Sequence, residues 1–179
     1  MSKKKILGGL LALILFLNYG CSLNDTEKYL QDLKSENAMV INNAIYYLGE
    51  EEEKRAVPML IELLNNDQLK ETRLNAIEAL GKIEEDSSVE ALVALLNEED
   101  KEIKTASCDA LGMIKNAKAV RHLIRILQDK DVRLTAIWAL GNIEDKSAVP
   151  ALTTLLDDKD KYVSSNAANA LKKIGSVSY

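Results

Sequence analysis

The stretch AIWALGNIEDKSAVPALTTLLDD, from Ala136 to Asp158, holds the only Trp of the chain, together with a Gly, a Pro and several acidic residues. It is one copy of a repeat, because AIEALGKIEEDSSVEALVALLNEED begins at Ala76 and ASCDALGMIKNAKAVRHLIRILQDKD begins at Ala106. The Leu of the ALG element recurs every 29 to 32 residues, at Leu48, Leu80, Leu111, Leu140 and Leu171. A period of this length fits one helical hairpin, and such hairpins bury their apolar faces by stacking into a solenoid.

Each repeat is expected to contain two helices. The first begins at the AVP element, where Pro58 and Pro150 fit the first turn because backbone N–H groups have no partner there. The second runs to the Gly of the ALG element, and we expect this Gly to end the helix, since glycine tolerates positive φ. These glycines are Gly81, Gly112 and Gly141. With an imperfect leading hairpin at 25–49, the sequence predicts an all-α fold, an α-solenoid of about five hairpins and about ten helices.

The repeat resembles the HEAT-like repeat family, in the short-period variety also found in the bilin lyases of phycobilisomes. The resemblance covers roughly residues 25–175, and the copy that shows it best contains Val132, Arg133, Ala139, Leu140, Gly141, Ile143, Ala148, Val149, Pro150 and Leu152. It implies that the second helices line a concave surface. It also implies a ladder in which acidic turn residues pair with the basic residue at the start of the helix that directly follows the turn. The basic positions are Arg73, Lys104 and Arg133, and the acidic candidates are Asp67, Asp100 and Asp129.

The N-terminal segment has the pattern of a secretion signal. A cationic start precedes the apolar run ILGGLLALILFL, whose 12 residues fall short of the ~20 that a membrane-spanning helix needs. Gly20, Cys21 and Ser22 resemble the lipobox of bacterial lipoproteins, in which the cysteine is acylated. Asn18 and Tyr19 depart from that motif, which has an aliphatic and a small residue in their places. The alternative is an ordinary signal peptide cleaved near Gly20, which leaves Cys21 as a free thiol.

These observations divide the chain into four parts. We expect a signal peptide at 1–20, a lipidated Cys21 and short tether at 21–24, a HEAT-like solenoid at 25–175 and a C-terminal tail at 176–179. The lipid would hold the protein on a membrane of a bacterial cell envelope, at its periplasmic or extracellular face.

The charge balance argues against nucleic acid as a partner. Without residues 1–20 the chain carries 20 Lys and Arg against 28 Asp and Glu, whereas binding to nucleic acid depends on cations that neutralise phosphates. A local basic cluster remains, and it is either a solvated face or a docking site for an acidic partner or lipid headgroups. It consists of Lys115, Lys118, Arg121, Arg125, Lys130 and Arg133.

No combination of residues predicts catalysis, a metal site or a cofactor. His122 is the only histidine, which excludes a two-histidine site within one chain, and we expect it to be a partly exposed structural residue. Cys108 takes the place of Ile77 and Ile137 in the second helix, so a buried apolar role is expected rather than a reactive thiol. Acidic clusters fall in turns and lack the ligand spacing of a calcium loop.

Functional residues are instead expected on the side of the second helices that faces away from the core. The position two residues before the aligned Leu points outward on a helix, and it reads Tyr46, Glu78, Asp109, Trp138 and Asn169. Leu134, one turn before Trp138, adds to an apolar patch, and exposed Trp residues are frequent binding hot spots. The other interpretation is that the rings fold over neighbouring hairpins.

The sequence therefore predicts a non-catalytic, membrane-tethered scaffold that binds a protein or peptide along a concave face. The partner-binding residues would be Tyr46, Glu78, Asp109, Leu134 and Trp138. Two alternatives stay open, a bilin lyase or chromophore chaperone and a structural factor for envelope assembly or oligomerisation.

Overall fold

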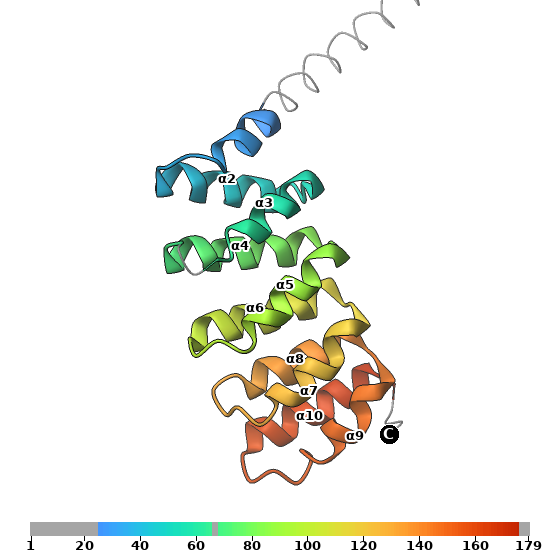
Figure 1. Ribbon diagram of the computed structural model, residues 1–179. Helices are drawn as coiled ribbons and strands as arrows, with labels where there is room; N and C mark the ends of the chain where they lie inside the picture. Colours follow the sequence, from blue (N-terminus) through green and yellow to red (C-terminus); the bar gives the residue numbers. More distant parts are fainter. Residues whose placement is uncertain (1–24, 66–67, 176–179) are drawn as a thin grey trace, which may run out of the picture.

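A computed structural model describes residues 25–65 and 68–175 of the chain. In these ranges all regular secondary structure is helical, and the helices form five hairpins stacked side by side (Figure 1). The predicted all-α solenoid is therefore confirmed, including the imperfect leading hairpin. The predicted signal peptide, Cys21 with its tether, the C-terminal tail and Asp67 lie outside the described residues.

Each hairpin pairs a short first helix with a longer second helix. The first helices are residues 25–32, α3 (Val57–Glu62), α5 (Val89–Leu95), α7 (Val120–Ile126) and α9 (Val149–Thr153). The second helices are α2 (Ala38–Glu50), α4 (Lys70–Ile83), α6 (Lys101–Ile114), α8 (Arg133–Ile143) and α10 (Lys161–Lys173). One turn of 3₁₀ helix precedes α3, α5, α7 and α9, namely η1 (Lys54–Ala56), η2 (Asp86–Ser88), η3 (Ala117–Ala119) and η4 (Lys146–Ala148).

The helix starts agree with the sequence. Pro58 and Pro150 lie in the first turns of α3 and α9, as predicted. Polar side chains cap three of the second helices, with Asn37, Asp100 and Asp160 accepting hydrogen bonds from backbone N–H groups of the first turn.

The prediction that the ALG glycines end the second helices is wrong. Helices α4, α6 and α8 each continue for two residues past the Gly. The left-handed residues that follow them are Glu84, Lys115 and Glu144, with φ between 52° and 58°. Hence the turn is made without glycine, and the glycine must have another role.

That role is close packing between neighbouring second helices. A Cβ placed on each Gly would approach an Ala of the next second helix to 3.1 Å or less. The pairs are Gly49 with Ala79, Gly81 with Ala110, Gly112 with Ala139 and Gly141 with Ala170. In α10, which has no successor among the described hairpins, Lys172 takes the Gly position and is exposed.

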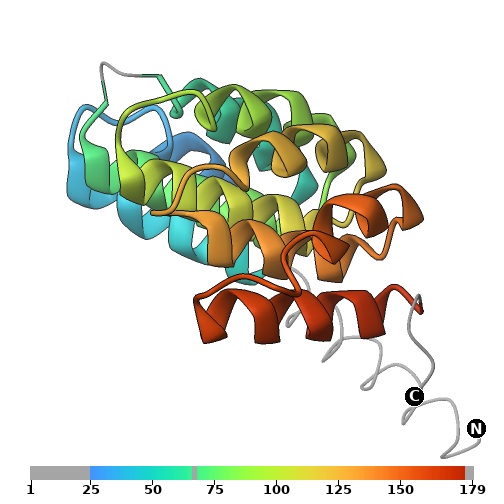
Figure 2. The same cartoon turned by 90° about the horizontal axis from the view of Figure 1, so that it is seen from below.

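The hairpins form two layers around one core. Second helices pack directly on second helices, whereas each first helix packs mainly on the second helix of its own hairpin (Figure 2). The core between the layers is built from the Leu, Ile, Val and Ala positions of the repeat, and the aligned Leu48, Leu80, Leu111, Leu140 and Leu171 are each 1% exposed or less. In a curved stack, the layer in which neighbouring elements pack most closely forms the concave side. Here that layer is the second helices, as the resemblance to HEAT-like repeats implies.

A ladder of ion pairs joins successive hairpins, but each acidic residue pairs with the basic residue of the preceding second helix and not, as predicted, with that of the following helix. Arg73 pairs with Glu98 at 2.5 Å, Lys104 pairs with Asp129, and Arg133 pairs with Asp158 at 3.3 Å. Each cation thus reaches the acidic residue of the next turn along the chain. Of the predicted acids, Asp129 belongs to the ladder.

Asp100 has another role than the one predicted. It caps α6 and pairs with Lys70 at 2.9 Å, so it is not a ladder partner of Arg73 or Lys104.

Candidate functional site

The predicted outward row is exposed along the whole layer of second helices. Tyr46 is 60% exposed and Trp138 is 41% exposed, and Glu78, Asp109 and Asn169 are exposed as well. We call this surface, made by the outward residues of α2, α4, α6, α8 and α10, the second-helix face. Their outward orientation is confirmed, and their contact with a partner stays a prediction.

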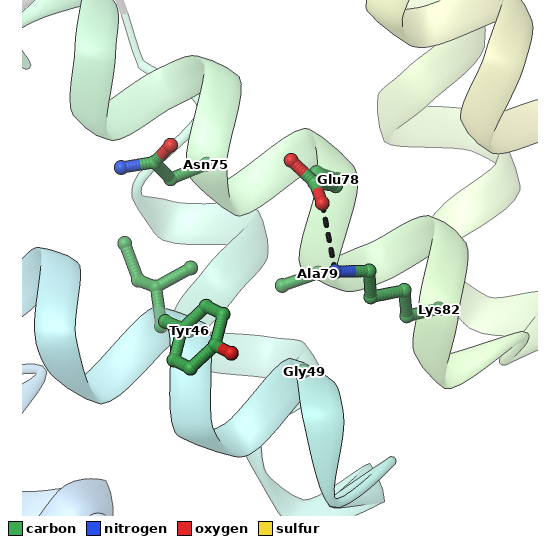
Figure 3. A pocket seen from close by; sticks show the side chains of 7 residues that line it. Tyr46, Gly49, Asn75, Glu78, Ala79 and Lys82 are labelled. Atoms are coloured by element: carbon green, nitrogen blue, oxygen red, sulfur yellow. Dashed lines mark ion pairs between the residues drawn. The ribbon is translucent and has the colours of Figure 1, made fainter.

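A hollow of about 110 Å³ opens on this face between α2 and α4. Figure 3 shows Tyr46 of α2 opposite the α4 residues that complete it. We call it the first hollow, and it is lined by Ile45, Tyr46, Gly49, Asn75, Glu78, Ala79 and Lys82. It exists because Gly49 and Ala79 bring the two helices together without large side chains above the contact.

Lys82 closes one side of the first hollow. Its Nζ atom is 2.7 Å from a carboxylate oxygen of Glu50 and 2.7 Å from one of Glu78 (Figure 3 shows the second pair). Hydrogen bonds to these two carboxylates raise the pKa of Lys82, so the lysine stays protonated and its single charge is shared between Glu50 and Glu78.

A second, smaller hollow of about 40 Å³ lies between α8 and α10 in the same register. We call it the second hollow, and it is lined by Trp138, Gly141, Asn166, Asn169, Ala170 and Lys173. Position by position, Trp138 replaces Tyr46, while the Gly, the Asn, the Ala and the Lys recur. The two hollows are therefore copies of one structural element, three hairpins apart.

Between the two hollows the corresponding glycines are covered by side chains. The Met113 sulfur lies over Gly81, 3.2 Å from where a Cβ would be, and the Trp138 ring lies over Gly112. Trp138 thus lines the second hollow with one part of its ring and leans on α6 with another. The alternative interpretation, that the ring folds over a neighbouring hairpin, is partly correct.

Asp109 carries an uncompensated charge in the outward row of this face. Within the described part of the chain no cation pairs with it, and partial burial raises the pKa of its carboxyl group. It lies one helical turn before Gly112, and residues three apart on a helix are neighbours on its surface. Asp109 and the Gly112 position that the Trp138 ring covers therefore lie on the same side of α6.

Leu134 is 42% exposed but does not share a hollow with Trp138. It lines a separate depression near the turn before α10, together with Lys130, Arg133 and Val163. The predicted apolar patch of these two side chains on α8 is thus divided between two surface features.

Sequence reasoning missed the polar residues shared by the two hollows, the asparagines Asn75 and Asn166 and the lysines Lys82 and Lys173. Their signal was available in the repeat, because Asn stands five residues before the aligned Leu and Lys two residues after it in both copies. Asn and Lys are ordinary residues on the exposed side of a helix, so these two residue types alone do not indicate a hollow between two helices.

The residues with catalytic potential are placed as predicted. Cys108 is fully buried, and this burial raises its pKa to about 12. His122 is partly exposed on α7, where burial and the neighbouring Arg121 and Arg125 lower its pKa. In the ranges that the structure describes, no three His, Cys, Asp or Glu side chains form a group able to hold a metal ion.

A groove on the first-helix side borders the basic cluster. It encloses about 410 Å³ between α5 and α7 and is lined in part by His122, Arg125 and Gln128. Arg121 donates a hydrogen bond to His122 Nε2 at 2.8 Å.

Helices long and apolar enough to cross a membrane are absent from residues 25–65 and 68–175.

The sequence matches the family model described as HEAT repeats at residues 57–133 and 122–178. Among curated proteins no match is found.

Solved structures show the same fold. The complex of CpcE and CpcF of phycocyanin lyase from Nostoc sp. matches with a TM-score of 0.72 and 24% identity, over 83% of this chain and 64% of that chain. The present chain thus spans less than two thirds of that protein's length. A designed armadillo repeat protein in complex with the peptide (KR)4 matches with a TM-score of 0.62 and 22% identity, over 82% and 80% of the chains. An engineered protein matches with a TM-score of 0.62 and 26% identity, over 84% and 79%.

Proposed function

Because the chain belongs to the HEAT-repeat family, we propose that it is a non-catalytic scaffold, tethered to a membrane through its N-terminus, that binds a protein or peptide along its second-helix face. The observation that carries the proposal is the outward row, where large side chains are exposed although the core does not need them. Tyr46 and Trp138 would anchor the partner, and Asp109 would select basic groups on it.

The charge of the second-helix face supports a basic partner. Besides Glu78 and Asp109, the outward positions seven residues earlier carry exposed acids in three hairpins, namely Glu71, Glu102 and Asp131. Glu102 pairs with Lys70 at 2.8 Å and Asp131 pairs with Lys101 at 3.5 Å, so in the described residues Glu71 and Asp109 are the acids of this face that no cation pairs with. Acidic surfaces attract cationic partners and exclude anionic ones. The solved neighbours add plausibility, since one is a designed protein in complex with a basic peptide and another is a complex of two proteins.

The binding proposal is tested by pull-down from the native envelope with the double substitution Trp138→Ala and Leu134→Ala. Partners recovered by the unaltered chain should be lost from the variant. Leu156→Ala is the control. Leu156 is 38% exposed, close to the 41% of Trp138, but Leu156 lies outside the second-helix face. Recovery of the same partners by the double variant would refute the mapping.

The tether is tested separately by mass spectrometry of the mature N-terminus. Acylation predicts a chain that begins at Cys21 and carries a diacylglyceryl thioether on its sulfur. A chain that begins near Cys21 with an unmodified thiol would instead support an ordinary signal peptide and remove the membrane from the proposal.

A lyase or chromophore chaperone is the second candidate, favoured by the similarity to the phycocyanin lyase complex. The burial and high pKa of Cys108 argue against this residue as a thiolate that could take part in the attachment. Incubation of the purified chain with bilin tests the candidate, because a bound chromophore would shift its absorption band.

A further inference from the structure

The two hollows define how far apart two contacts with one partner would lie. They are formed by the same positions of the repeat and are separated by three steps between adjacent second helices, from α2 to α8. Packed helices lie about 8–10 Å apart, and the Gly–Ala contacts favour the lower end of that range. The hollows are therefore about 24–30 Å apart.

An extended peptide is the occupant whose dimensions fit this separation. An extended chain advances about 3.3 Å per residue, so about seven to nine residues cover the distance between the hollows. A helix of the partner rises only about 1.5 Å per residue and would need about twice as many residues. Each hollow is small, with volumes of about 110 Å³ and about 40 Å³, and so admits part of one side chain.

The surface between the hollows determines the chemistry of the middle of the peptide. Asp109 lies there on α6, three residues before Gly112, which the Trp138 ring covers, and in the described residues no cation pairs with it. A cation placed over an aromatic face and next to a carboxylate is stabilised by both. Glu78 lies one hairpin away and already pairs with Lys82, whereas Asp109 has no such pair, so Asp109 is the better of the two sites for a cation.

The lysines extend this pattern to the ends of the face. Lys82 borders the first hollow and Lys173 borders the second, where it donates to Asn142 at 2.7 Å. Lys173 thus gives the second hollow a positive charge, whereas Lys82 shares its charge between Glu50 and Glu78, and the uncompensated negative charge of Asp109 lies between the two hollows. Apolar side chains are favoured in the hollows themselves, and basic side chains are favoured between them.

We propose that the second-helix face takes an extended peptide segment of a partner protein, with two apolar anchor residues about eight positions apart and basic residues between them. The anchors enter the first and second hollows against Tyr46 and Trp138, and a Lys or Arg of the segment contacts Asp109 and the Trp138 ring. This inference rests on the proposed function and adds the conformation, spacing and charge of the ligand.

Trp138 provides a direct measurement because it is the only Trp of the chain. The full chain in mild detergent is titrated with synthetic peptides that carry two Phe anchors and intervening Lys residues, and Trp138 fluorescence is followed. An anchor spacing of eight should give the tightest binding. Spacings of four and twelve should lose about tenfold in affinity, since each leaves one apolar anchor in water. A peptide with Glu in place of Lys should not bind.

Variants assign the contacts to residues. Tyr46→Ala should abolish the preference for a spacing of eight, and Asp109→Asn should weaken the Lys peptide while removing its salt dependence. The control is Glu90→Gln, which removes an exposed carboxylate from α5 in the other layer and should leave affinity unchanged. The fluorescence anisotropy of a labelled peptide provides a second measure of binding for each variant, and circular dichroism verifies that each variant is folded.

Three results would overturn the inference: equal affinity at all spacings, equal affinity for the Glu peptide, or the same loss in Glu90→Gln as in Asp109→Asn. If no peptide binds but envelope partners are still lost on substitution of Trp138 and Leu134, the extended-peptide inference fails and the proposed function stands. If those partners are retained as well, both fail.

Discussion

The glycines of the repeat separate two structural roles at the level of single residues. Gly112 lies inside α6, where a Cβ would come to 2.8 Å from the Ala139 Cα and 2.6 Å from the Trp138 ring. Glu144, in contrast, adopts φ 58° after α8, in the region that glycine favours. The helix interior thus needs a small residue, and the turn tolerates a strained one.

Gly112→Ala should therefore destabilise the fold by about 1–3 kcal/mol, as overpacked sites do, and urea unfolding measures this. At an ordinary helix position the same change stabilises by roughly 0.5–1 kcal/mol. Glu144→Gly is the companion variant and should be neutral or stabilising, because it relieves a left-handed non-glycine residue. A stabilised Gly112→Ala variant would mean that the glycine is not a packing contact.

Cys108 should not react with thiol reagents while the chain is folded. Its side chain is fully buried and its pKa is raised to about 12, so both access and thiolate are lacking at neutral pH. A colorimetric thiol assay with and without denaturant tests this. Rapid labelling of Cys108 in the native chain would instead indicate an opening between the two layers.

Asp109 and Asp129 should affect stability in opposite directions as pH changes. Partial burial raises the pKa of Asp109, so its ionisation in the folded state costs stability as pH rises above the value of the unfolded chain. Hydrogen bonding to Lys104 lowers the pKa of Asp129, so its contribution is present at neutral pH and is lost as pH falls through the folded-state pKa.

Asp109→Asn is therefore expected to be more stable than the unaltered chain at pH 7, and Asp129→Asn less stable. The difference for Asp109→Asn should vanish below about pH 3.9, where carboxyl groups of unfolded Asp are protonated. The difference for Asp129→Asn should vanish only once the pH has fallen below the lowered folded-state pKa of Asp129. Thermal unfolding followed across this pH range gives the comparison. Equal effects of the two variants would show that Asp109 has a cationic partner.

At the level of elements, the ladder joins successive hairpins at their turns, next to the apolar core between the two layers. Arg73 is buried, donates to the Leu64 carbonyl at 2.9 Å and pairs with Glu98 at 2.5 Å. Arg133 repeats the arrangement with the Leu127 carbonyl at 2.7 Å. The end of one hairpin's first helix is thereby linked to the turn of the next hairpin.

Arg73→Met should cost about 2–4 kcal/mol, since hydrogen bonds to charged groups contribute about 1.5–3 kcal/mol and the buried carbonyl loses its donor. Arg55→Met is the control. Arg55 also pairs with two carboxylates but has a side chain that is 54% exposed, so its loss should cost less than about 1 kcal/mol. Urea unfolding of both variants distinguishes them, and equal costs would exclude a structural role for the ladder.

How much the sequence could predict differs between these elements. The period and the apolar positions predicted all five described hairpins, because burial depends on spacing along the helix. The true helix ends could not be found in the same way, because a Gly at position 141 fits both a helix end and a close contact between two helices. Likewise, Asp100 and Glu98 both lie in one polar turn, and only the packing shows which of them Arg73 reaches.

The candidate site follows the same division. The outward direction of Tyr46 and Trp138 could be predicted from one helix, because it depends on that helix alone. The hollows could not, because each needs residues from two helices at a particular separation. The lean of the Trp138 ring onto Gly112 also depends on a neighbouring hairpin.

At the level of the whole molecule, the layer of second helices has a continuous exposed surface with an aromatic residue at either end of an acidic middle. This arrangement extends across four hairpins and belongs to no single repeat. We propose that this second-helix face is the surface that binds the partner.

Site-specific photocrosslinking in the native organism tests this claim most directly. A photoreactive amino acid is placed at Glu78 or Trp138 on the second-helix face, and at Glu90 or Leu156 outside it. We expect one crosslinked partner that is captured from Glu78 and from Trp138 and is not captured from Glu90 or Leu156. Capture of the same partner from Glu90 or Leu156, with none from Glu78 and Trp138, would contradict it.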